Sequence, residues 1–532
     1  MDAQMIQRFC EECGFELTAS AQFCENCGTE VVDSIESAVT GKASGFISKT
    51  GFLNGVQCQK LFWYYYHGRP HFPKANAATQ FRFNQGNVIG ELAKQLFPDG
   101  MEVPNQNPRD LEAAAQSTLE VLASRKPLFE ASVLHQGAYG RIDVLNPVGD
   151  GQWDIYEVKS STSVKDVHLH DVAFQKHVAE AFGLNIRDCF LIHVSSRYNM
   201  GAQVDPGQLL AIAPLTGRIE HLSGWVTETI AHLKPILAQE SAPEVPIGRH
   251  CNVPYKCDLK GHCWASLPEN NVFTLYRGGN LAWELFERGI TDIAKIDCLD
   301  RLTWRQRIQY DTVKSGQPHI DRKKLGLFMS KLQYPLYHLD FETFGPAMPL
   351  YEGVRPYQQV PFQFSLHRVD KAGADPIHSE YLAEDTSDPR RKFMEQLVAN
   401  LGQHGSIVTY NAAFEKARLK ECCEAMPEYA EWYEALRPRI VDLLVPFRAF
   451  SYYHPTQKGS ASIKAVLPAL TGAGYEELQI QDGVSAGAEF YRVYFEEASD
   501  DQRQQVREQL LAYCSMDTLA MHWIYESLRK IV

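Results

Sequence analysis

The sequence lacks any long hydrophobic run. None of its 532 residues fall in a stretch of about 18 uncharged apolar residues, so no transmembrane helix is expected. The first residues, Met-Asp-Ala-Gln-Met-Ile-Gln-Arg, also lack the apolar segment of a signal peptide. We therefore expect a cytoplasmic protein that makes no membrane contact.

The sequence also has fewer basic than acidic residues. The chain has 52 Lys and Arg against 65 Asp and Glu, a formal net charge of −13. This balance argues against a histone-like protein that holds nucleic acid by its overall charge. Any surface that follows phosphates would have to be a local basic patch. Catalytic carboxylates would add negative charge that a bound divalent metal offsets locally.

Internal repeats and low-complexity tracts are absent too, and the length predicts three or four domains. Composition and periodicity predict an α/β multidomain protein. Its segments are a metal module at residues 8–31, a small and polar linker at 32–45, a mixed α/β domain at 46–265, a helical connector at 266–330 and a second α/β domain at 331–532. In the connector, Leu281, Leu285 and Ile290 form an apolar stripe, and Gly289 is expected to end a helix.

Two closely spaced cysteine pairs lie near the N-terminus. They are Cys10-Glu-Glu-Cys13 and Cys24-Glu-Asn-Cys27, with ten residues between them. Each pair places two thiolates on one turn, so together they supply the four sulfur ligands of a tetrahedral Zn²⁺. Zinc would contribute on the order of 10 kcal/mol to the folding of so short a segment. The pattern resembles a zinc ribbon, whose role could be structural, protein-docking or nucleic-acid-contacting.

The other cysteines divide into two groups. Four lie on either side of a group of acidic residues, at Cys58, Cys251, Cys257 and Cys263. The remaining five lie in apolar surroundings and are predicted to be buried thiols: Cys189, Cys298, Cys422, Cys423 and Cys514.

The acidic group of the middle segment consists of Asp143, Glu157 and Lys159. Residues 131–160 predict a hairpin with a turn at 146–151, in which Glu157 and Lys159 share one face and Val158 lies opposite. Asp143 reaches that face from the neighbouring strand. The two carboxylates suit Mg²⁺ or Mn²⁺, and the lysine can orient water or stabilise a charged phosphorane.

This pattern resembles the RecB-type branch of the PD-(D/E)XK nucleases, over about residues 46–265. The resemblance implies a restriction-endonuclease-like α/β fold, catalysis by Asp143, Glu157 and Lys159, and a contact of Gln175 with metal-bound water or DNA. In AddB-like and CRISPR-associated relatives, one cysteine before the nuclease core and three after it ligate a [4Fe–4S] cluster. The same layout here implies a cluster at Cys58, Cys251, Cys257 and Cys263, with zinc or free thiols as alternatives.

One position departs from the RecB-type pattern. The family often has a metal-binding histidine on an early helix, and Gly90 stands in its place, with Glu91 next to it. Glu91 could serve as a metal ligand. Otherwise it is a solvated helix residue and the site is weakened.

A second acidic group lies in the last 200 residues. A strand that begins near Tyr334 ends with Asp340 and Glu342 on one side, and Glu415 lies on the first turn of a helix that follows the strand at 406–411. Tyr513 and Asp517 are four residues apart on a long helix at 502–530, and so share a face.

These motifs resemble the DnaQ-like, DEDD-type 3′–5′ exonucleases of the ribonuclease H-like fold, over about residues 333–532. The resemblance implies that Asp340, Glu342, Glu415 and Asp517 hold two divalent metals about 4 Å apart. Tyr513 would position the attacking water. Glu415 stands where the family usually has Asp.

Three further residues lie before and in the next predicted helix. Ser460, Ser462 and Lys464 are candidates for substrate contact, because helix N-termini bind phosphate, or they simply cap the helix. Asp442 is either a supporting acid near the site or a helix cap.

The order of the modules resembles a bacterial family that joins a RecB-like nuclease to a DnaQ-like domain. The sequence therefore predicts a metal-dependent nuclease that acts on DNA, in repair or in defence against foreign DNA. Two alternatives stay open, a nucleic-acid-binding scaffold with degenerate sites and a ribonuclease. The zinc ribbon offers a docking site for a protein partner.

Overall fold

The computed structural model describes residues 8–9, 16–17, 45–104 and 110–532. Cys10, Cys13, Cys24, Cys27 and the predicted linker up to residue 44 lie outside the described residues. Within the predicted metal module, β1 (Arg8–Phe9) pairs antiparallel with β2 (Glu16–Leu17).

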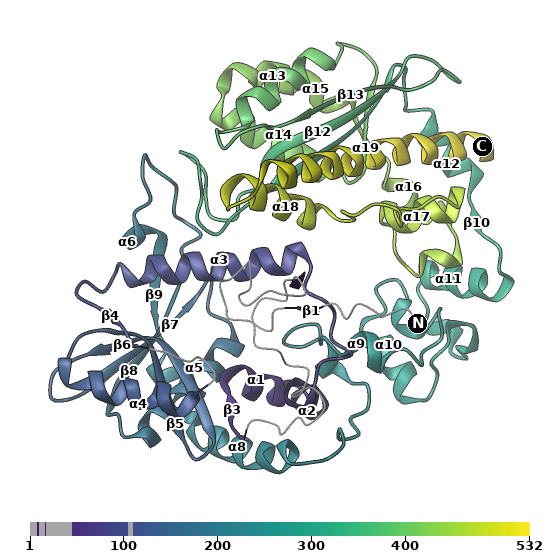
Figure 1. Cartoon of the computed structure of the whole chain (residues 1–532). Coiled ribbons are helices and arrows are strands. Elements are labelled where there is room, and N and C mark those ends of the chain that lie inside the picture. Colours follow the sequence, from purple (N-terminus) through teal and green to yellow (C-terminus); the bar gives the residue numbers. More distant parts are fainter. Residues whose placement is uncertain (1–7, 10–15, 18–44, 105–109) are drawn as a thin grey trace, which may run out of the picture. The chain divides into compact units, whose positions relative to one another are not determined.

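The chain divides into two compact units (Figure 1). The first unit comprises the described residues up to Ala265 together with residues 346–357, and the second unit comprises residues 266–345 and 358–532. The segment 346–357 is fixed within the first unit by the Ala347 N–H, which donates to Oε1 of the buried Gln85 at 2.7 Å. Residues 266–330 cluster with the second unit.

A mixed sheet forms the centre of the first unit. Its strand order is β4-β5-β6-β7-β8-β9, with β3 paired to β6. The strands are β3 (Ile47–Ser48), β4 (Met101–Glu102), β5 (Leu128–His135), β6 (Ala138–Pro147), β7 (Trp153–Lys159), β8 (Ile186–Val194) and β9 (Leu210–Pro214). The β5–β6 and β6–β7 pairs are antiparallel, whereas β7 and β8 run parallel.

The predicted strand leading up to Asp143 is interrupted by a turn that the sequence analysis missed. Gln136 and Gly137 both have positive φ, of 45° and 79°, and connect β5 to β6. Two consecutive residues with positive φ are typical of the tight turn that matches the twist of a hairpin. The prediction of one continuous strand was therefore wrong at this turn, and Asp143 lies on the middle strand of a three-stranded meander.

Helices cover both faces of this sheet. They are α1 (Lys49–Gln57), α2 (Gln59–His67), α3 (Ala77–Lys94), α4 (Leu111–Val121), α5 (Asp166–Phe182), α6 (Pro206–Leu209), α7 (Thr216–Ile219), α8 (Ser223–Leu237) and α9 (Lys260–Cys263). Phe174 of α5 packs in one core cluster with Ile155 of β7, whereas Ile89 of α3 packs in another with Val158 of the same strand. Because neighbouring strand residues alternate, α5 and α3 lie on opposite faces.

A five-stranded sheet forms the centre of the second unit, in the order β13-β12-β11-β14-β15. The strands are β11 (Leu336–Phe344), β12 (Val360–Val369), β13 (Ile377–Leu382), β14 (Ser406–Thr409) and β15 (Ile440–Asp442). The central strand β11 is antiparallel to β12 and parallel to β14. A separate short pair joins β10 (His319–Ile320) to β16 (Tyr452–Tyr453).

Helices flank this second sheet as well. They are α10 (Gly279–Glu287), α11 (Trp304–Ser315), α12 (Arg322–Met329), α13 (Arg390–Asn400), α14 (Ala413–Ala425), α15 (Ala430–Leu436), α16 (Val445–Arg448), α17 (Ile463–Thr471), α18 (Gly483–Phe495) and α19 (Asp500–Ile531). Leu339 and Phe341 of β11 pack in one cluster with Phe393 of α13 and Leu419 of α14. The long helix α19 packs against β11 and β12. Figure 1 labels α19 and β12. Alternation therefore turns Asp340 and Glu342 away from the cluster that holds Leu339 and Phe341.

The predicted stripe of residues 266–330 forms a small core of its own. Leu285 of α10 is fully buried, and Leu281 and Ile290 pack against the same cluster. Gly289, at φ 80°, follows the end of α10. Among the described residues, no helix combines the length and apolar character needed to cross a membrane.

Candidate metal centres

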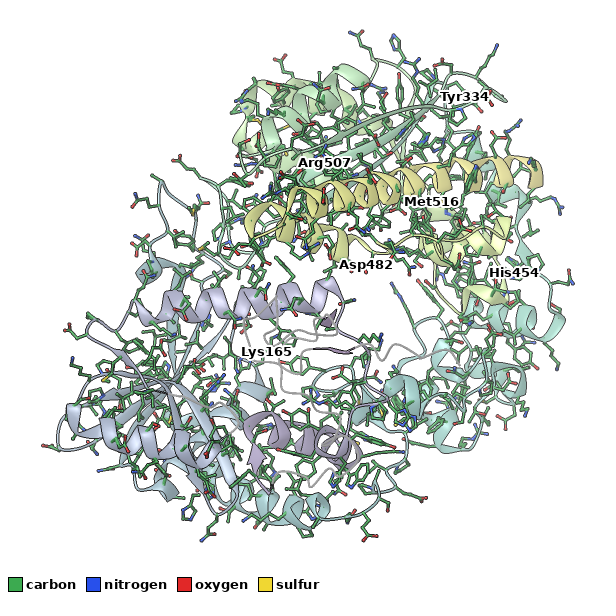
Figure 2. The ribbon with its side chains drawn as sticks, viewed as in Figure 1. Lys165, Tyr334, His454, Asp482, Arg507 and Met516 are labelled. Carbon is green, nitrogen blue, oxygen red and sulfur yellow. The ribbon has the colours of Figure 1, made fainter. Side chains whose placement is uncertain are left out.

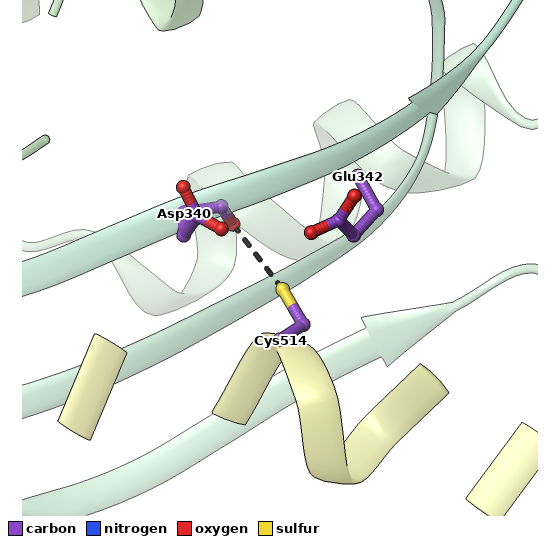
Figure 3. Close-up of side chains that lie close together, drawn as sticks. All are labelled: Asp340, Glu342 and Cys514. Atoms are coloured by element: carbon purple, nitrogen blue, oxygen red, sulfur yellow. Dashed lines mark hydrogen bonds between the residues drawn. The ribbon is translucent and has the colours of Figure 1, made fainter. Parts of the chain in front are cut away.

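Asp340, Glu342 and Cys514 meet in the second unit (Figure 3). One ligand atom from each lies within 4.8 Å of the other two. The carboxylates come from β11 and the thiol from α19, and Cys514 Sγ donates to the main-chain oxygen of Asp340 at 3.8 Å. Glu342 and Cys514 are buried. The cysteine was predicted only as a buried thiol, so its place beside two acids is new information from the structure.

Asp517 and Tyr513 approach the same acids from α19. Asp517 is 6% exposed and accepts a hydrogen bond from the Tyr475 hydroxyl at 2.6 Å. Tyr513 lies one turn earlier, on the face predicted from its spacing, and its side chain acts to lower the pKa of Asp517. Met516, labelled in Figure 2, marks this part of the helix. The sequence analysis did not identify Tyr475, which no motif distinguishes from the other tyrosines.

Glu342 and Asp517 are buried and Asp340 is half-buried, with little positive charge near them. Burial, and after it the Asp517 carboxylate, raises the pKa of Asp340 and Glu342 well above the ordinary range. Lys464 acts in the opposite direction on Glu342 and Asp517, but it does not restore their ordinary pKa. Several carboxylates that repel one another in a low-dielectric site fit a divalent cation, for which carboxylate oxygen is the preferred ligand.

Glu415 is the fourth acid of this group. It lies on the first turn of α14, is 2% exposed, and has a carboxylate oxygen, Oε2, without a hydrogen-bond partner among the described residues. Burial above all raises the pKa of Glu415 to about 8, and the charge of Asp442 adds to the shift. Its own charge in turn raises the pKa of Asp340. An orphaned buried carboxylate oxygen also fits a bound cation. Asp340, Glu342, Glu415 and Asp517 are called the second-unit acid cluster below.

Asp442 holds a turn beside this cluster. Its Oδ1 accepts from the main-chain N–H groups of Asn411, at 2.9 Å, and Leu444, at 3.0 Å. These hydrogen bonds do not cap a helix, because Leu444 is the N-cap of α16 and no side chain among the described residues caps that helix, while the charge of Asp442 raises the pKa of Glu415.

Of the three candidate substrate contacts, Lys464 is brought to the acid cluster. Its Nζ donates to the main-chain oxygen of Gln481 and lies 3.4 Å from the Tyr513 hydroxyl. Ser462 is the N-cap of α17, and its N–H donates to Ser460 Oγ at 3.1 Å. The serine hydroxyls bond to each other, also at 3.1 Å. Asp482, labelled in Figure 2, caps α18 and raises the pKa of Glu342 further.

The first unit brings together Asp143, Glu157, Lys159 and Gln175. Glu157 is 1% exposed, and its Oε1 accepts from Lys159 Nζ at 2.5 Å, while its Oε2 accepts from Gln175 Nε2 at 2.6 Å. Asp143 Oδ2 accepts from the Val158 N–H at 2.6 Å, which ties β6 to β7. The four residues predicted from the sequence are therefore neighbours.

Two further residues complete this first-unit site. Lys49, the first residue of α1, places its Nζ 2.8 Å from Glu157 Oε1 and 3.8 Å from Asp171 Oδ1. Asp171 of α5 also pairs with Lys159 Nζ at 2.7 Å. Asp171 lies four residues before Gln175, so helical spacing could have identified it. Lys49 is more than 100 residues from Glu157, and nothing in its local sequence points to the site.

The charges of the first-unit site largely balance. Burial opposes ionisation of Glu157, but Lys159 and Lys49 outweigh it and hold the pKa of Glu157 far below its usual range. Burial, then the Glu157 charge, raises the pKa of Asp143 to about 7. The carboxylates suit Mg²⁺ or Mn²⁺ in kind, but both oxygens of Glu157 are already hydrogen-bonded to Lys49, Lys159 and Gln175. A metal ion would have to displace a lysine to bind there.

Glu91 is not brought to the first-unit site. Its side chain is 71% exposed and pairs with Lys94 at 2.7 Å on the surface of α3. Side chains alternate along β7, so Val158 and Glu157 lie on opposite faces of the sheet. Helix α3, which carries Glu91, packs on the face of Val158. A Cβ on Gly90 would meet no atom within 4 Å. The expectation that Glu91 replaces the missing histidine therefore finds no geometric support.

Cys58, Cys251, Cys257 and Cys263 line one pocket of the first unit, called the cysteine pocket below. Cys58 is the N-cap of α2 and Cys263 the last residue of α9, so sequence-distant segments meet here. Burial, together with the smaller effect of the other three thiols, raises the pKa of Cys257 to about 11. Four thiols in one pocket form a donor set that fits an iron–sulfur cluster.

The spacing of these thiols can be compared with the geometry of a zinc site. Tetrahedral zinc with sulfur at about 2.3 Å brings its ligands to about 3.8 Å from one another. Among the described residues, no three of these thiols have sulfur atoms that all lie within 4.8 Å of one another. The group that meets this limit consists of Asp340, Glu342 and Cys514. The four thiols are spaced more widely than one zinc ion requires. Of the cysteines predicted as plain thiols, Cys189, Cys422 and Cys423 are buried, and Cys298 is half-buried.

Two family models match parts of the chain. A zinc-ribbon domain matches residues 9–31, which confirms the predicted ribbon around the N-terminal cysteine pairs. A domain of unknown function, DUF2779, matches residues 337–462, which include Asp340, Glu342 and Glu415.

Two curated relatives share modest similarity. The Uncharacterized protein UU173 of Ureaplasma parvum serovar 3 is 25% identical over 265 residues, 45% of this chain and 37% of that protein. The Uncharacterized protein MG366 of Mycoplasma genitalium is 28% identical over 215 residues, 36% of this chain and 32% of that protein. The chain thus spans about a third of the length of these relatives.

Among solved structures, an alkaline exonuclease (LHK-Exo) from Laribacter hongkongensis aligns with 37% of this chain and 91% of its own. The sequence identity is 12% and the TM-score is 0.17. A score this low does not define a shared fold.

Proposed function

We propose that the protein is a metal-dependent nuclease that hydrolyses phosphodiester bonds, with its main hydrolytic site at the second-unit acid cluster. One observation carries the proposal: Glu342 of β11, Glu415 of α14 and Asp517 of α19 are buried beside the half-buried Asp340 of β11, and the charges of Asp517 and Glu415 raise the pKa of Asp340 and of Glu342. Holding these carboxylates together costs stability unless a cation binds, so the arrangement is that of a metal site.

The residues of the cluster have separable roles in this proposal. Asp340, Glu342, Glu415 and Asp517 would hold Mg²⁺ or Mn²⁺, which supplies Lewis-acid activation of phosphate oxygen and of water. Burial and then the Asp517 charge raise the pKa of Tyr513, so its hydroxyl stays protonated and acts as a donor that orients water. Lys464 Nζ lies 3.4 Å from that hydroxyl and could contact a phosphate oxygen.

The arrangement supports a DnaQ-like, ribonuclease H-like assignment for the second unit and thus trimming of DNA from the 3′ end. The first-unit site supports a RecB-like, restriction-endonuclease-like assignment, with a [4Fe–4S] cluster in the cysteine pocket. The zinc ribbon would serve as a docking element for nucleic acid or a protein partner. The cellular role that suits these parts is DNA repair or defence against foreign DNA in the cytoplasm.

A second candidate function rests on the charge balance of the first-unit site. Lys49 and Lys159 already neutralise Glu157 and Asp171, which favours a first unit that binds nucleic acid without cutting it. In the full form of this alternative both sites are degenerate and the protein is a scaffold. Ribonuclease activity is the third reading, because none of the residues named above selects against a 2′-hydroxyl.

The test is a cleavage assay on the full chain purified without oxygen. Single- and double-stranded DNA and RNA, labelled at the 5′ or 3′ end, are incubated with Mn²⁺, Mg²⁺ or EDTA. We expect metal-dependent 3′–5′ trimming of DNA that the Asp340→Asn variant loses. Asp501→Asn removes an exposed carboxylate from α19 and is the matched control.

The remaining outcomes assign or exclude the other sites. Loss of a separate cleavage product in the Glu157→Gln variant would identify the first unit as a second nuclease. Degradation that is unchanged in Asp340→Asn would refute the second-unit assignment. No cleavage of any substrate by iron- and zinc-loaded protein would favour the scaffold.

A further inference from the structure

One part of this acidic chain contains no acidic residue. Residues 45–90 include five Lys and Arg and no Asp or Glu, although the whole chain carries −13. The segment around the last three pocket cysteines, residues 248–264, adds three Lys and Arg against the single Asp258. These two segments meet at the cysteine pocket, so the fold concentrates basic residues there. A chain that repels phosphate overall thus has one local region of opposite sign.

Aromatic rings interleave with the cations of this region. His71 and His262 stack with centroids 3.9 Å apart and planes 14° apart, and Tyr64 contacts both rings edge-on, at 5.3 and 5.9 Å. The Arg69 guanidinium lies 4.3 Å from the ring of Tyr65. Arg69, His71 and His262 are exposed to solvent. Tyr64, Tyr65, Arg69, His71 and His262 are called the aromatic–basic surface.

This surface rests on a rigid base. Tyr64 packs against the buried cluster of Leu61, Cys257 and Leu259, as do Phe72 and the pocket cysteines Cys58 and Cys263. Tyr64 belongs to α2, whose N-cap is Cys58, and His262 immediately precedes Cys263. The rings are therefore held in place by the same packing that gathers the four thiols, and they lose little conformational entropy on binding a planar ligand.

We propose that the aromatic–basic surface binds single-stranded nucleic acid, with bases on the exposed rings and phosphates on the neighbouring cations. Proteins that bind single strands combine a positive surface with rings on which bases stack, at about 1–3 kcal/mol per base. In a duplex the faces of the bases are stacked on one another, so a duplex could contact only the cations of this surface. The proposal rests on the proposed function and adds to it the form of the substrate and the surface that binds it. Its test requires no cleavage.

A simpler role for the cations is to balance the charge of thiolates in the cysteine pocket. The two roles differ in what Arg69 and His71 do, because neither lines that pocket. Charge balance predicts that changing them leaves nucleic-acid affinity intact. Binding predicts that affinity falls while the iron content stays the same.

The experiment measures fluorescence anisotropy of a labelled 20-nucleotide DNA strand with oxygen-free full-chain protein in EDTA, at several salt concentrations. His71→Ala removes one ring of the stacked pair, and we expect at least about fivefold weaker binding. Arg69→Gln removes one cation, and we expect the slope of log affinity against log salt to fall by ~0.7. Arg218→Gln is the matched control, since Arg218 is an exposed cation on α7 of the same unit.

Two further measurements keep the result decisive. His71→Phe retains a ring, so it should bind the strand within about twofold of wild type, and iron analysis of each variant reports whether the cysteine pocket is intact. The proposal is overturned if His71→Ala and Arg69→Gln bind like Arg218→Gln, if Phe and Ala at position 71 weaken binding equally, or if only duplex binding falls. Normal cleavage with unaltered binding in the surface variants would leave the proposed function standing and remove this inference alone.

Discussion

Replacing Glu415 with Gln tests whether the second-unit acid cluster is strained without metal. Glu415 is 2% exposed, and its pKa is raised from the ordinary 4.5 to about 8. In metal-free protein between these two pH values the folded chain keeps this proton and the unfolded chain has lost it. Stability therefore falls as pH rises through this window, by about 1.4 kcal/mol per pH unit.

The size of the effect follows from the width of that window. From 4.5 to about 8 is 3.5 pH units, which corresponds to a loss of about 5 kcal/mol at pH 8 and above. Gln cannot ionise, so the Glu415→Gln variant should not show this loss. A buried amide without partners has a cost of its own, about 1–3 kcal/mol, but that cost does not depend on pH. The diagnostic is therefore the difference in slope between the two proteins.

The assay is urea unfolding in EDTA between pH 5 and pH 8. After equilibration in urea, each sample is given a short pulse of deuterium at one common pH. Mass spectrometry of peptides from α14 then reports the unfolding of the second unit alone. We expect wild type to lose about 4 kcal/mol more than Glu415→Gln over these three pH units. Glu424→Gln is the control, because Glu424 lies on the same helix and is exposed. Parallel slopes for wild type and Glu415→Gln would refute the reasoning that this carboxylate is buried without a counter-charge.

Three further predictions follow from the same contacts. Tyr475→Phe removes the 2.6 Å hydrogen bond that stabilises ionised Asp517, so the acid limb of any metal-dependent cleavage should move to higher pH in a rate–pH profile. Lys49→Met removes one of the two lysines that pair with Glu157. In urea unfolding, the first unit of this variant should be destabilised by about 2–4 kcal/mol in EDTA and should be stabilised more than wild type by added Mn²⁺. Cys257→Ser should release iron from protein purified without oxygen while zinc at the ribbon is retained, as measured by elemental analysis.

The sequence places the residues of the second-unit acid cluster by spacing rules that are local. Alternation along a strand places Asp340 and Glu342 on one side, and a four-residue interval on a helix places Tyr513 and Asp517 on one face. Neither rule needs the rest of the chain. The acids that matter most therefore fall within short motifs that can be read directly.

The residues that were missed are brought in by tertiary packing. Lys49 reaches Glu157 because α1 packs against α5, and Tyr475 reaches Asp517 from the segment between α17 and α18. Glu91 illustrates the opposite error, because a residue near a motif was assumed to share its site although α3 lies on the other face of the sheet. The turn at Gln136 was missed because Gln-Gly is a weaker signal than Asn-Gly for a residue with positive φ.

The two acid sites differ in how their negative charge is balanced, and this difference predicts different affinities for metal. In the first unit Lys49 and Lys159 hold Glu157 ionised, so its charge is already compensated within the protein. In the second unit the pKa of Asp340 and of Glu342 is raised, so full ionisation of those acids requires a cation from outside. A divalent metal gains more from a site whose carboxylates lack partners than from one where it must displace an ammonium group. Metal should thus bind first at the second unit, and Mn²⁺ titration of the Glu157→Gln and Asp340→Asn variants should show the tighter site lost only in Asp340→Asn.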